Sequence, residues 1–237
     1  MTDTIPGATL RPCGEDAFVV EFGDAIDPAA GARVGALTKA LDAAAPPGLV
    51  EVVPTFRSVL VVYDPETTSR EAILSAIPPL PGDAAAAASL WRIPVCLEGA
   101  AAEDIAEAAE GLGIPQEELR ARFLASDLRV GMYGFAPGFA YLSGLDPALA
   151  IPRRPKPRAP MAPGSVIIAG GMAALNSASL PTGWYVVGRT AVRPFRPDRT
   201  PMVPFAVGDR LAFRAVGEAD LARLAADETG GAERIAP

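Results

Sequence analysis

Arginines on a proline-rich segment are the residues of this sequence best suited to chemistry. Residues 151–163 read IPRRPKPRAPMAP and contain five prolines, so the backbone there is extended and stiff. A guanidinium group can hold a carboxylate or a phosphate with two parallel hydrogen bonds. The segment therefore predicts capture of a small anion by Arg153, Arg154 and Arg158. The alternative is a solvated connecting arm, and the lysine in it, Lys156, is read as a surface residue.

Aromatic residues flank a turn just before this segment. Residues 131–145 read GMYGFAPGFAYLSGL, in which Pro137 fixes its own backbone angles and Gly138 allows angles closed to other residues. Such a shaped loop predicts that Phe135, Phe139 and Tyr141 face a ligand or a partner. The alternative is a packed aromatic corner in the core.

A glycine-flanked run follows the arginines. Ser165 begins an apolar strand-like run that ends in Gly170-Gly171, whose backbone amides could hold an oxyanion. The run lacks the G-x-x-x-x-G-K-[ST] pattern of a phosphate loop. Trp184 and Arg189 complete the candidate surface, although a tryptophan is more often a core residue than a ligand platform.

Several common catalytic groups are missing from the composition. The chain has no histidine, so neither a Ser-His-Asp site, a Cys-His site nor a His-ligated metal can come from it alone. Its two cysteines, Cys13 and Cys96, form no C-x-x-C pair and are expected to be reduced thiols. We therefore expect no metal ligated by this chain.

Charge is unevenly distributed along the chain. The net charge is −7, yet residues 151–216 hold ten Arg or Lys and two Asp, which gives +8 for that segment. A cationic block in an anionic protein suits an anionic small molecule or an acidic surface, or else pairs with carboxylates elsewhere in the chain. The overall charge argues against nucleic acid binding. No apolar run of membrane-spanning length and no signal peptide pattern is present, so we expect a cytoplasmic protein with no membrane partner.

The elements that must position these residues predict an α+β protein. In residues 1–82 we expect strand-like 17–22, a helix after Asp27-Pro28, strands 49–54 and 58–63, and a helix 69–77. Strand, helix, two strands and helix suit a ferredoxin-like unit if one more strand returns. A Pro-rich and Ala-rich stretch at 78–88 is the predicted boundary.

The second predicted unit spans residues 90–216, and its sequence pattern changes along its length. A strand at 91–97 and helices at 102–112 and 115–124 come first. From 129 to 214 short apolar runs alternate with Gly and Pro, which is typical of strands closing into a barrel or sandwich. Residues 217–237 are expected to form a C-terminal tail with one helix at 218–227.

Taken together, the sequence resembles the allophanate hydrolase subunit 1 / KipI family, which includes the B-type subunits of 5-oxoprolinase. The resemblance covers about residues 11 to 216. The positions that carry it are Gly14–Ala17, Val53-Pro54, Ser58–Val61, Gly134–Leu142, Pro152–Arg154, Pro157-Arg158, Pro163–Val166, Gly170-Gly171, Gly183-Trp184 and Gly188–Thr190.

This resemblance implies a ferredoxin-like first domain and a cyclophilin-like β-barrel second domain. It also implies a larger partner, which is either an allophanate hydrolase subunit 2 or a protein like the C-type subunits of 5-oxoprolinase. The implied activity is that of a non-autonomous subunit of an ATP-dependent amidohydrolase, which opens 5-oxoproline to glutamate with ATP and water. ATP would act at the level of the complex, and the substrate would be a small anionic amide.

Site residues follow from the resemblance together with their chemistry. Catalysis is expected from Ser165, Arg158 and Tyr141. Substrate binding is expected from a larger set: Phe135, Pro137, Arg153, Arg154, Gly170, Gly171, Trp184 and Arg189.

Two other functions stay open for a member of this family. One is inhibition of a sensor histidine kinase, as in KipI itself. The other is half of a urea- or allophanate-type biotin-dependent carboxyltransferase. The chain also departs from the family at residues 172–177, MAALNS, where a Gln, a Thr and a Tyr are usual. That departure favours either a different substrate or a scaffolding role.

Overall fold

The chain divides into two compact units, Met1–Ala87 and Ala88–Pro237. The computed structural model describes residues 5–80 and 88–235, so most of the boundary predicted at 78–88 lies outside the described residues. No helix in the described part of the chain is both long enough and apolar enough to cross a membrane.

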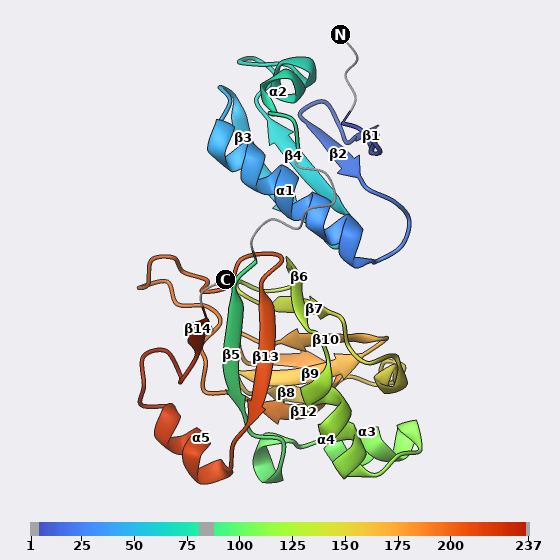
Figure 1. The fold of residues 1–237 in the computed structure, drawn as a ribbon, viewed down its shortest axis with the longest axis vertical. Coiled ribbons are helices and arrows are strands. Elements are labelled where there is room, and N and C mark those ends of the chain that lie inside the picture. Colours follow the sequence, from blue (N-terminus) through green and yellow to red (C-terminus); the bar gives the residue numbers. More distant parts are fainter. Residues whose placement is uncertain (1–4, 81–87, 236–237) are drawn as a thin grey trace. The chain divides into compact units, whose positions relative to one another are not determined.

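The first unit is a four-stranded antiparallel sheet with helices on one face (Figure 1). Its strands are β1 (Thr9–Pro12), β2 (Ala17–Glu21), β3 (Leu49–Pro54) and β4 (Ser58–Tyr63), in the order β1-β2-β4-β3. Its helices are α1 (Pro28–Ala44) and α2 (Arg70–Ala76). Among the described residues of this unit no strand returns to the sheet after α2, and the edge beside β2 is occupied instead by β1, which precedes β2 in the chain.

Local sequence explains the main helix of this unit. Asp27 caps α1, its side chain accepting a hydrogen bond from the Ala30 amide, and Pro28 occupies the first turn. Val34, Leu37 and Leu41 recur at helical spacing and are fully buried against the sheet. The α1 helix thus covers one face of the first sheet.

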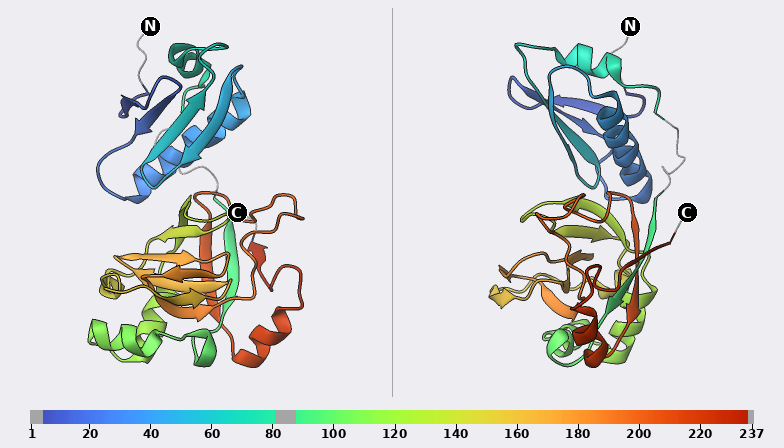
Figure 2. Two further views of the ribbon diagram at one scale, coloured as in Figure 1. Left: turned by 180° about the vertical axis from the view of Figure 1, so that it is seen from behind. Right: turned by 90° about the vertical axis from the view of Figure 1, so that its left-hand side faces the viewer.

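The second unit contains most of the strands. They are β5 (Leu90–Val95), β6 (Arg129–Tyr133), β7 (Ala140–Ser143), β8 (Arg158–Met161), β9 (Ser165–Ala169), β10 (Met172–Leu175), β11 (Leu180–Thr182), β12 (Tyr185–Arg189), β13 (Arg210–Ala215) and β14 (Glu233–Ile235). The helices are α3 (Ile105–Leu112), α4 (Gln116–Ala125) and α5 (Glu218–Leu224), with 3-10 turns η1 (Gly99–Ala101) and η2 (Pro147–Leu149). Helices α3, α4 and α5 lie at the same end of this unit (Figure 2).

Eight of these strands form one sheet, in the order β12-β9-β10-β7-β6-β13-β5-β14. The β5 and β13 strands pair in parallel, which joins the start of the unit to its late sequence. Among the described residues no ladder joins β12 to β5, but a single antiparallel bridge pairs Cys96, just after β5, with Arg189 at the end of β12. The structure is therefore a mixed α/β fold with several sheets, and the strand ladders do not close a barrel.

Both faces of the middle strands are covered. One core cluster gathers residues from β5, β6, β7, β9, β10, β12 and β13, together with Leu119 and Phe123 from α4. A second cluster places Met161 of the two-stranded β8–β11 ribbon against Ile167 and Val186 on the opposite face. This arrangement explains why β9 is buried at every position and reads as a continuous apolar run.

The C-terminal segment, expected to be a tail, belongs to the second unit. The β14 strand pairs antiparallel with β5, and Leu221 of α5 packs with Cys96 and Ala101. The predicted helix at 218–227 ends at Leu224.

Candidate functional site

Two of the arginines predicted to bind an anion are held by acidic residues at the start of α3. Arg158 Nη1 lies 2.6 Å from Asp104 Oδ2, and its other terminal nitrogen pairs with Glu103. Arg154 Nη1 lies 2.7 Å from Glu107 Oε2 and 3.4 Å from Asp104 Oδ1. The ion pairs with Glu103 and Asp104 raise the pKa of Arg158 against the opposing effect of burial. Arg154 and Arg158 therefore pair with carboxylates elsewhere in the chain, which was the alternative to binding of an anionic ligand.

Asp104 joins this cluster to the sheet. Its backbone amide donates to the Val186 carbonyl at 2.9 Å, and its Oδ2 accepts from the Val186 amide at 2.8 Å. The residue is 8% exposed, and its carboxylate receives donors from both the arginines and the backbone of β12. Arg154 and Arg158 thereby fix the proline-rich segment against α3 and β12.

The predicted aromatic residues form a row of ring contacts that runs from an exposed residue into the core. Ring centroids are 5.4 Å apart for Phe135 and Phe139, 4.9 Å for Phe139 and Tyr141, and 6.0 Å for Tyr141 and Trp184. The guanidinium of Arg153 lies 5.7 Å from the Trp184 ring centre. Phe139 and Trp184 are buried, so the row is a packed corner at one end and exposed at the other.

Phe135 forms the exposed end of this row. It is 66% exposed and its φ is +69°, a left-handed conformation that costs a residue with a Cβ about 1 kcal/mol. Backbone hydrogen bonds from Phe139 to Ala136 and from Gly134 to Phe139 close the turn around it. The neighbouring Pro137 is exposed as well. The loop therefore presents Phe135 outward in a fixed conformation.

The predicted oxyanion loop is divided between two places. Ser165 is 1% exposed, and its hydroxyl donates to the Ala162 carbonyl at 2.7 Å. Gly170 and Gly171 form the turn between β9 and β10, both with positive φ, at the opposite end of β9. Ser165 instead pairs in register with Arg189 on the neighbouring strand β12.

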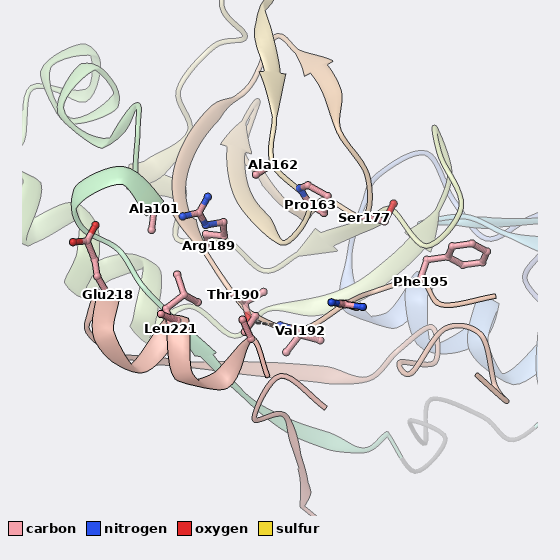
Figure 3. A pocket seen from close by; sticks show the side chains of 14 residues that line it. Ala101, Ala162, Pro163, Ser177, Arg189, Thr190, Val192, Phe195, Glu218 and Leu221 are labelled. Carbon is pink, nitrogen blue, oxygen red and sulfur yellow. Dashed lines mark hydrogen bonds between the residues drawn. The ribbon is translucent and has the colours of Figure 1, made fainter. Parts of the chain in front are cut away.

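Arg189 lies in a cleft of about 650 Å³ on the second unit (Figure 3). Figure 3 shows Ala162, Pro163 and Ser177 along one side, and Glu218 and Leu221 of α5 on the other. Arg193 and Phe195 also line it. Cys96 packs against Leu221 of this wall, and burial chiefly raises the pKa of its thiol, so the thiol stays protonated and unreactive at neutral pH.

The two arginines of the cleft differ from those at Asp104. Neither Arg189 nor Arg193 forms an ion pair with a carboxylate within the described part of the chain. The acid that lines the cleft, Glu218, accepts a hydrogen bond from the Ala100 amide at 3.0 Å. No cluster of His, Cys, Asp and Glu suited to a metal ion occurs among the described residues.

Sequence reasoning found Arg189 but missed Arg193, Ser177 and the α5 wall of the cleft. Arg193 lies in a segment without a chemical motif, Ser177 ends the segment 172–177 that was noted only as a departure from the family, and α5 was expected in a tail. It also missed Asp104, because an acidic residue at a helix start is ordinarily solvated. The structure thus separates the predicted site into the Asp104 cluster, the aromatic row and the cleft.

Comparisons with known proteins agree along almost the whole chain. A family model described as carboxyltransferase domain, subdomain C and D, matches residues 8–205. The relative named as the B subunit of 5-oxoprolinase in Bacillus subtilis (strain 168) is 29% identical over 225 residues, which is 89% of this chain and 94% of the relative. These matches confirm the resemblance drawn from the sequence.

Two solved structures are similar in fold and sequence. TTHA0988 is 33% identical with a TM-score of 0.77; the match covers 88% of this chain but spans only 40% of the length of that chain. PH0987, a conserved uncharacterized protein from Pyrococcus horikoshii, is 34% identical with a TM-score of 0.54, over 90% of this chain and 100% of that one.

Proposed function

Because this chain belongs to the family of carboxyltransferase domains, subdomains C and D, we propose that it is a subunit of a heteromeric 5-oxoprolinase-type complex. The observation that carries the proposal is the similarity to a relative named as the B subunit of 5-oxoprolinase, over 94% of that relative. A protein named as one lettered subunit works with others, so the chain is proposed to be a hydrolase component that is inactive alone.

We propose that its partner is a larger protein, either of the allophanate hydrolase subunit 2 type or of the C type in 5-oxoprolinase. The match to TTHA0988 supports a partner, since that chain contains a region like this one together with a further 60% of its length. The complex would open 5-oxoproline to glutamate with ATP and water. ATP would bind at the level of the complex, because no phosphate loop pattern occurs in this sequence.

Within this chain, the proposed roles follow the geometry. Arg189 holds the carboxylate of the substrate, because it lines a cleft and pairs with no acid of the described residues. Arg154 and Arg158 position the proline-rich segment through Asp104. Phe135, Pro137 and Arg153, which are exposed, form the face at which the partner would meet this subunit. Tyr141 and the buried Trp184 support this face through ring contacts. Ser165 and the turn at Gly170-Gly171 support β9 from its two ends.

We also propose that the two units are ferredoxin-like and cyclophilin-like, as the resemblance implies. The helix-covered antiparallel sheet supports the first assignment. The bridge between Cys96 and Arg189 supports the second, because it brings the end of β5 to the end of β12, as closure of a barrel requires.

The experiment that tests the function is reconstitution with the larger partner encoded in the source genome. Native mass spectrometry of the co-expressed pair should show a stoichiometric complex. After addition of any third subunit, that complex should release glutamate and ADP in equal amounts from 5-oxoproline and ATP. Arg189→Gln should leave assembly intact and raise the KM for 5-oxoproline about tenfold or more. A stoichiometric complex without this turnover would contradict the proposal, and so would a histidine kinase as the co-purifying protein.

A second candidate function is favoured by the description of the matching family model as a carboxyltransferase domain. In that case the complex would accept a carboxyl group from carboxybiotin. Co-purification of a biotinylated carrier, detected with streptavidin, would distinguish this function from ATP-dependent opening of an amide.

A further inference from the structure

The cleft around Arg189 has the size and lining of a small-molecule site. Its volume of about 650 Å³ lies within the range of roughly 300–1,000 Å³ found for ligand pockets. One wall comes from α5, which contributes the apolar side chains of Leu221 and Ala222 and, at its start, the carboxylate of Glu218. Ala101 packs with Leu221. Arg189 and Ser177 lie across the cleft from α5 (Figure 3), and Arg193 also lines the cleft.

The cations of the cleft are available to a ligand. Elsewhere in the cationic segment Arg154, Arg158, Arg196 and Arg210 each pair with a carboxylate. Arg189, half-buried, and Arg193, exposed, pair with none in the part of the chain that is described. With the carboxylate of Glu218 in the same lining, Arg189 and Arg193 leave the cleft a net formal charge of +1, which favours binding of one anion.

Ser177 adds a polar group of a different kind. Its Oγ is shielded from solvent and has no hydrogen-bond partner within residues 5–80 and 88–235. A shielded hydroxyl without a partner is unfavourable; it can donate one hydrogen bond and accept up to two. A polar group of a ligand in the cleft would satisfy it.

We propose that this cleft binds a small organic carboxylate: Arg189 and Arg193 hold the carboxylate, α5 packs against the apolar body, and Ser177 meets a second polar group. 5-Oxoproline has these three parts, since it is a lactam ring that bears a carboxylate. The choice of this ligand rests on the proposed function, whereas the class of ligand rests on the lining of the cleft alone.

Four probes separate the three contacts when the full chain is titrated by calorimetry and by ligand-observed NMR. They are 5-oxoproline, 2-pyrrolidinone (the same lactam without the carboxylate), cyclopentanecarboxylate (the carboxylate without the lactam) and inorganic phosphate. We expect 5-oxoproline to bind at least about tenfold more tightly than 2-pyrrolidinone, because a charge-assisted arginine pair is lost in the latter. Cyclopentanecarboxylate should bind between the two, and phosphate more weakly than 5-oxoproline because it lacks an apolar body.

Substitutions of the lining residues test whether 5-oxoproline binds in this cleft. Arg189→Gln and Arg193→Gln should each weaken 5-oxoproline about tenfold or more and leave 2-pyrrolidinone unchanged. Ser177→Ala should weaken 5-oxoproline and leave cyclopentanecarboxylate unchanged. Arg223→Gln is the matched control, because this arginine is on α5, 73% exposed in its side chain and outside the lining.

Three outcomes would overturn the inference: no binding of 5-oxoproline by the chain, equal binding of 2-pyrrolidinone, or displacement by phosphate at equal concentration. The first two remove the carboxylate contact without any variant, so a folding defect cannot produce them. Turnover of 5-oxoproline by the complex with no binding in this cleft would leave the proposed function standing and refute the inference. Binding in the cleft without turnover by the complex would support the inference and refute the proposed function.

Discussion

Asp104 forms ion pairs with two of the arginines that the sequence predicts for anion binding. It faces Arg158 at 2.6 Å and Arg154 at 3.4 Å, and it also accepts the Val186 amide. A carboxylate that neutralises two partly buried guanidinium groups cannot be removed without leaving their charge uncompensated. The acid partner thus decides which arginines of the cationic segment remain free for a ligand.

Asp104→Asn should lower the free energy of unfolding by about 2–4 kcal/mol, because it leaves two half-buried arginines with one fewer acid. Urea denaturation followed by tryptophan fluorescence measures the change. Asp220→Asn is the control, since its pair with Arg223 is exposed and should contribute about 0.5 kcal/mol or less. Equal losses in the two variants would refute a special role for Asp104.

The buried hydroxyl of Tyr133 should make the free energy of unfolding fall at alkaline pH. Burial, with the charge of Asp209 nearby, raises the pKa of its hydroxyl well above the ordinary value of about 10. As pH rises past about 10 the unfolded chain ionises first, so the stability present below that pH is lost above it.

Tyr133→Phe should therefore make the unfolding free energy less steep between about pH 9 and 10.5, as measured by urea denaturation at each pH. At neutral pH the variant should lose about 1 kcal/mol, because the hydroxyl donates to the Phe205 carbonyl at 2.8 Å. The buried thiol of Cys96 contributes the same trend to both proteins and cancels in the comparison. Parallel pH curves would contradict the assignment.

Residue type and spacing could single out Arg189 but not its neighbours in the cleft. The acids that occupy Arg154 and Arg158 come from residues 103–107, about fifty positions earlier, and only tertiary folding brings them together. Ser177 belongs to the segment that departs from the family pattern, but only the structure shows that its hydroxyl is enclosed without a partner among the described residues. The sequence therefore predicted that arginines would bind an anion, but not which arginines and neighbouring residues form the cleft.

At the scale of elements, the local sequence predicted the helices and strands that have a clear cap or a clear apolar pattern. The expected strands at 49–54 and 58–63 match β3 and β4, and α1 begins at the predicted Asp27-Pro28 cap. Strands β1 and β14 were missed, because each is three or four residues long and lacks alternating apolar positions. Such edge strands are specified by the partner strand and not by their own sequence.

The turn before β9 gives a test at this scale. Gly164 has φ of +81°, and a Cβ there would lie 2.3 Å from the Thr190 carbonyl oxygen. Gly170 also has positive φ, +59°, with no atom within 4 Å of a Cβ. Gly170→Ala should cost about 1 kcal/mol of stability through backbone strain alone, and Gly164→Ala at least about 2 kcal/mol more through the clash.

Thermal and urea denaturation of the two alanine variants measure this difference. Because Thr190 and Pro163, which adjoin this turn, line the cleft, Gly164→Ala should also weaken ligand binding there. Equal stability of the two variants would show that the turn relaxes away from Thr190.

At the scale of the whole molecule, each unit has its own core. The clusters around Leu37 and Val61 in the first unit and around Leu142 and Phe213 in the second contain residues of one unit only. A unit with its own core can fold alone. We therefore expect residues 88–237 alone to unfold cooperatively and to keep the near-UV circular dichroism of Trp91 and Trp184.

A chain of residues 88–216 is the matched comparison. It lacks α5 and β14, and with them Leu221 and the strand that covers the outer edge of β5. Its midpoint of urea unfolding should be lower than that of residues 88–237 by an amount corresponding to about 2 kcal/mol or more. Identical midpoints would show that the segment after residue 216 is an appendage.

The position of β5 also bears on how the protein is made. This strand opens the second unit, yet its two neighbours in the sheet, β13 and β14, are at residues 210–215 and 233–235. On a translating ribosome, β5 emerges on the order of ten seconds before either neighbour exists. The first unit can fold during that interval, while the apolar face of β5 awaits its neighbours. The sheet of the second unit is thus completed only after β14 has left the ribosome, and until then the unpaired edges of β5 are exposed to aggregation.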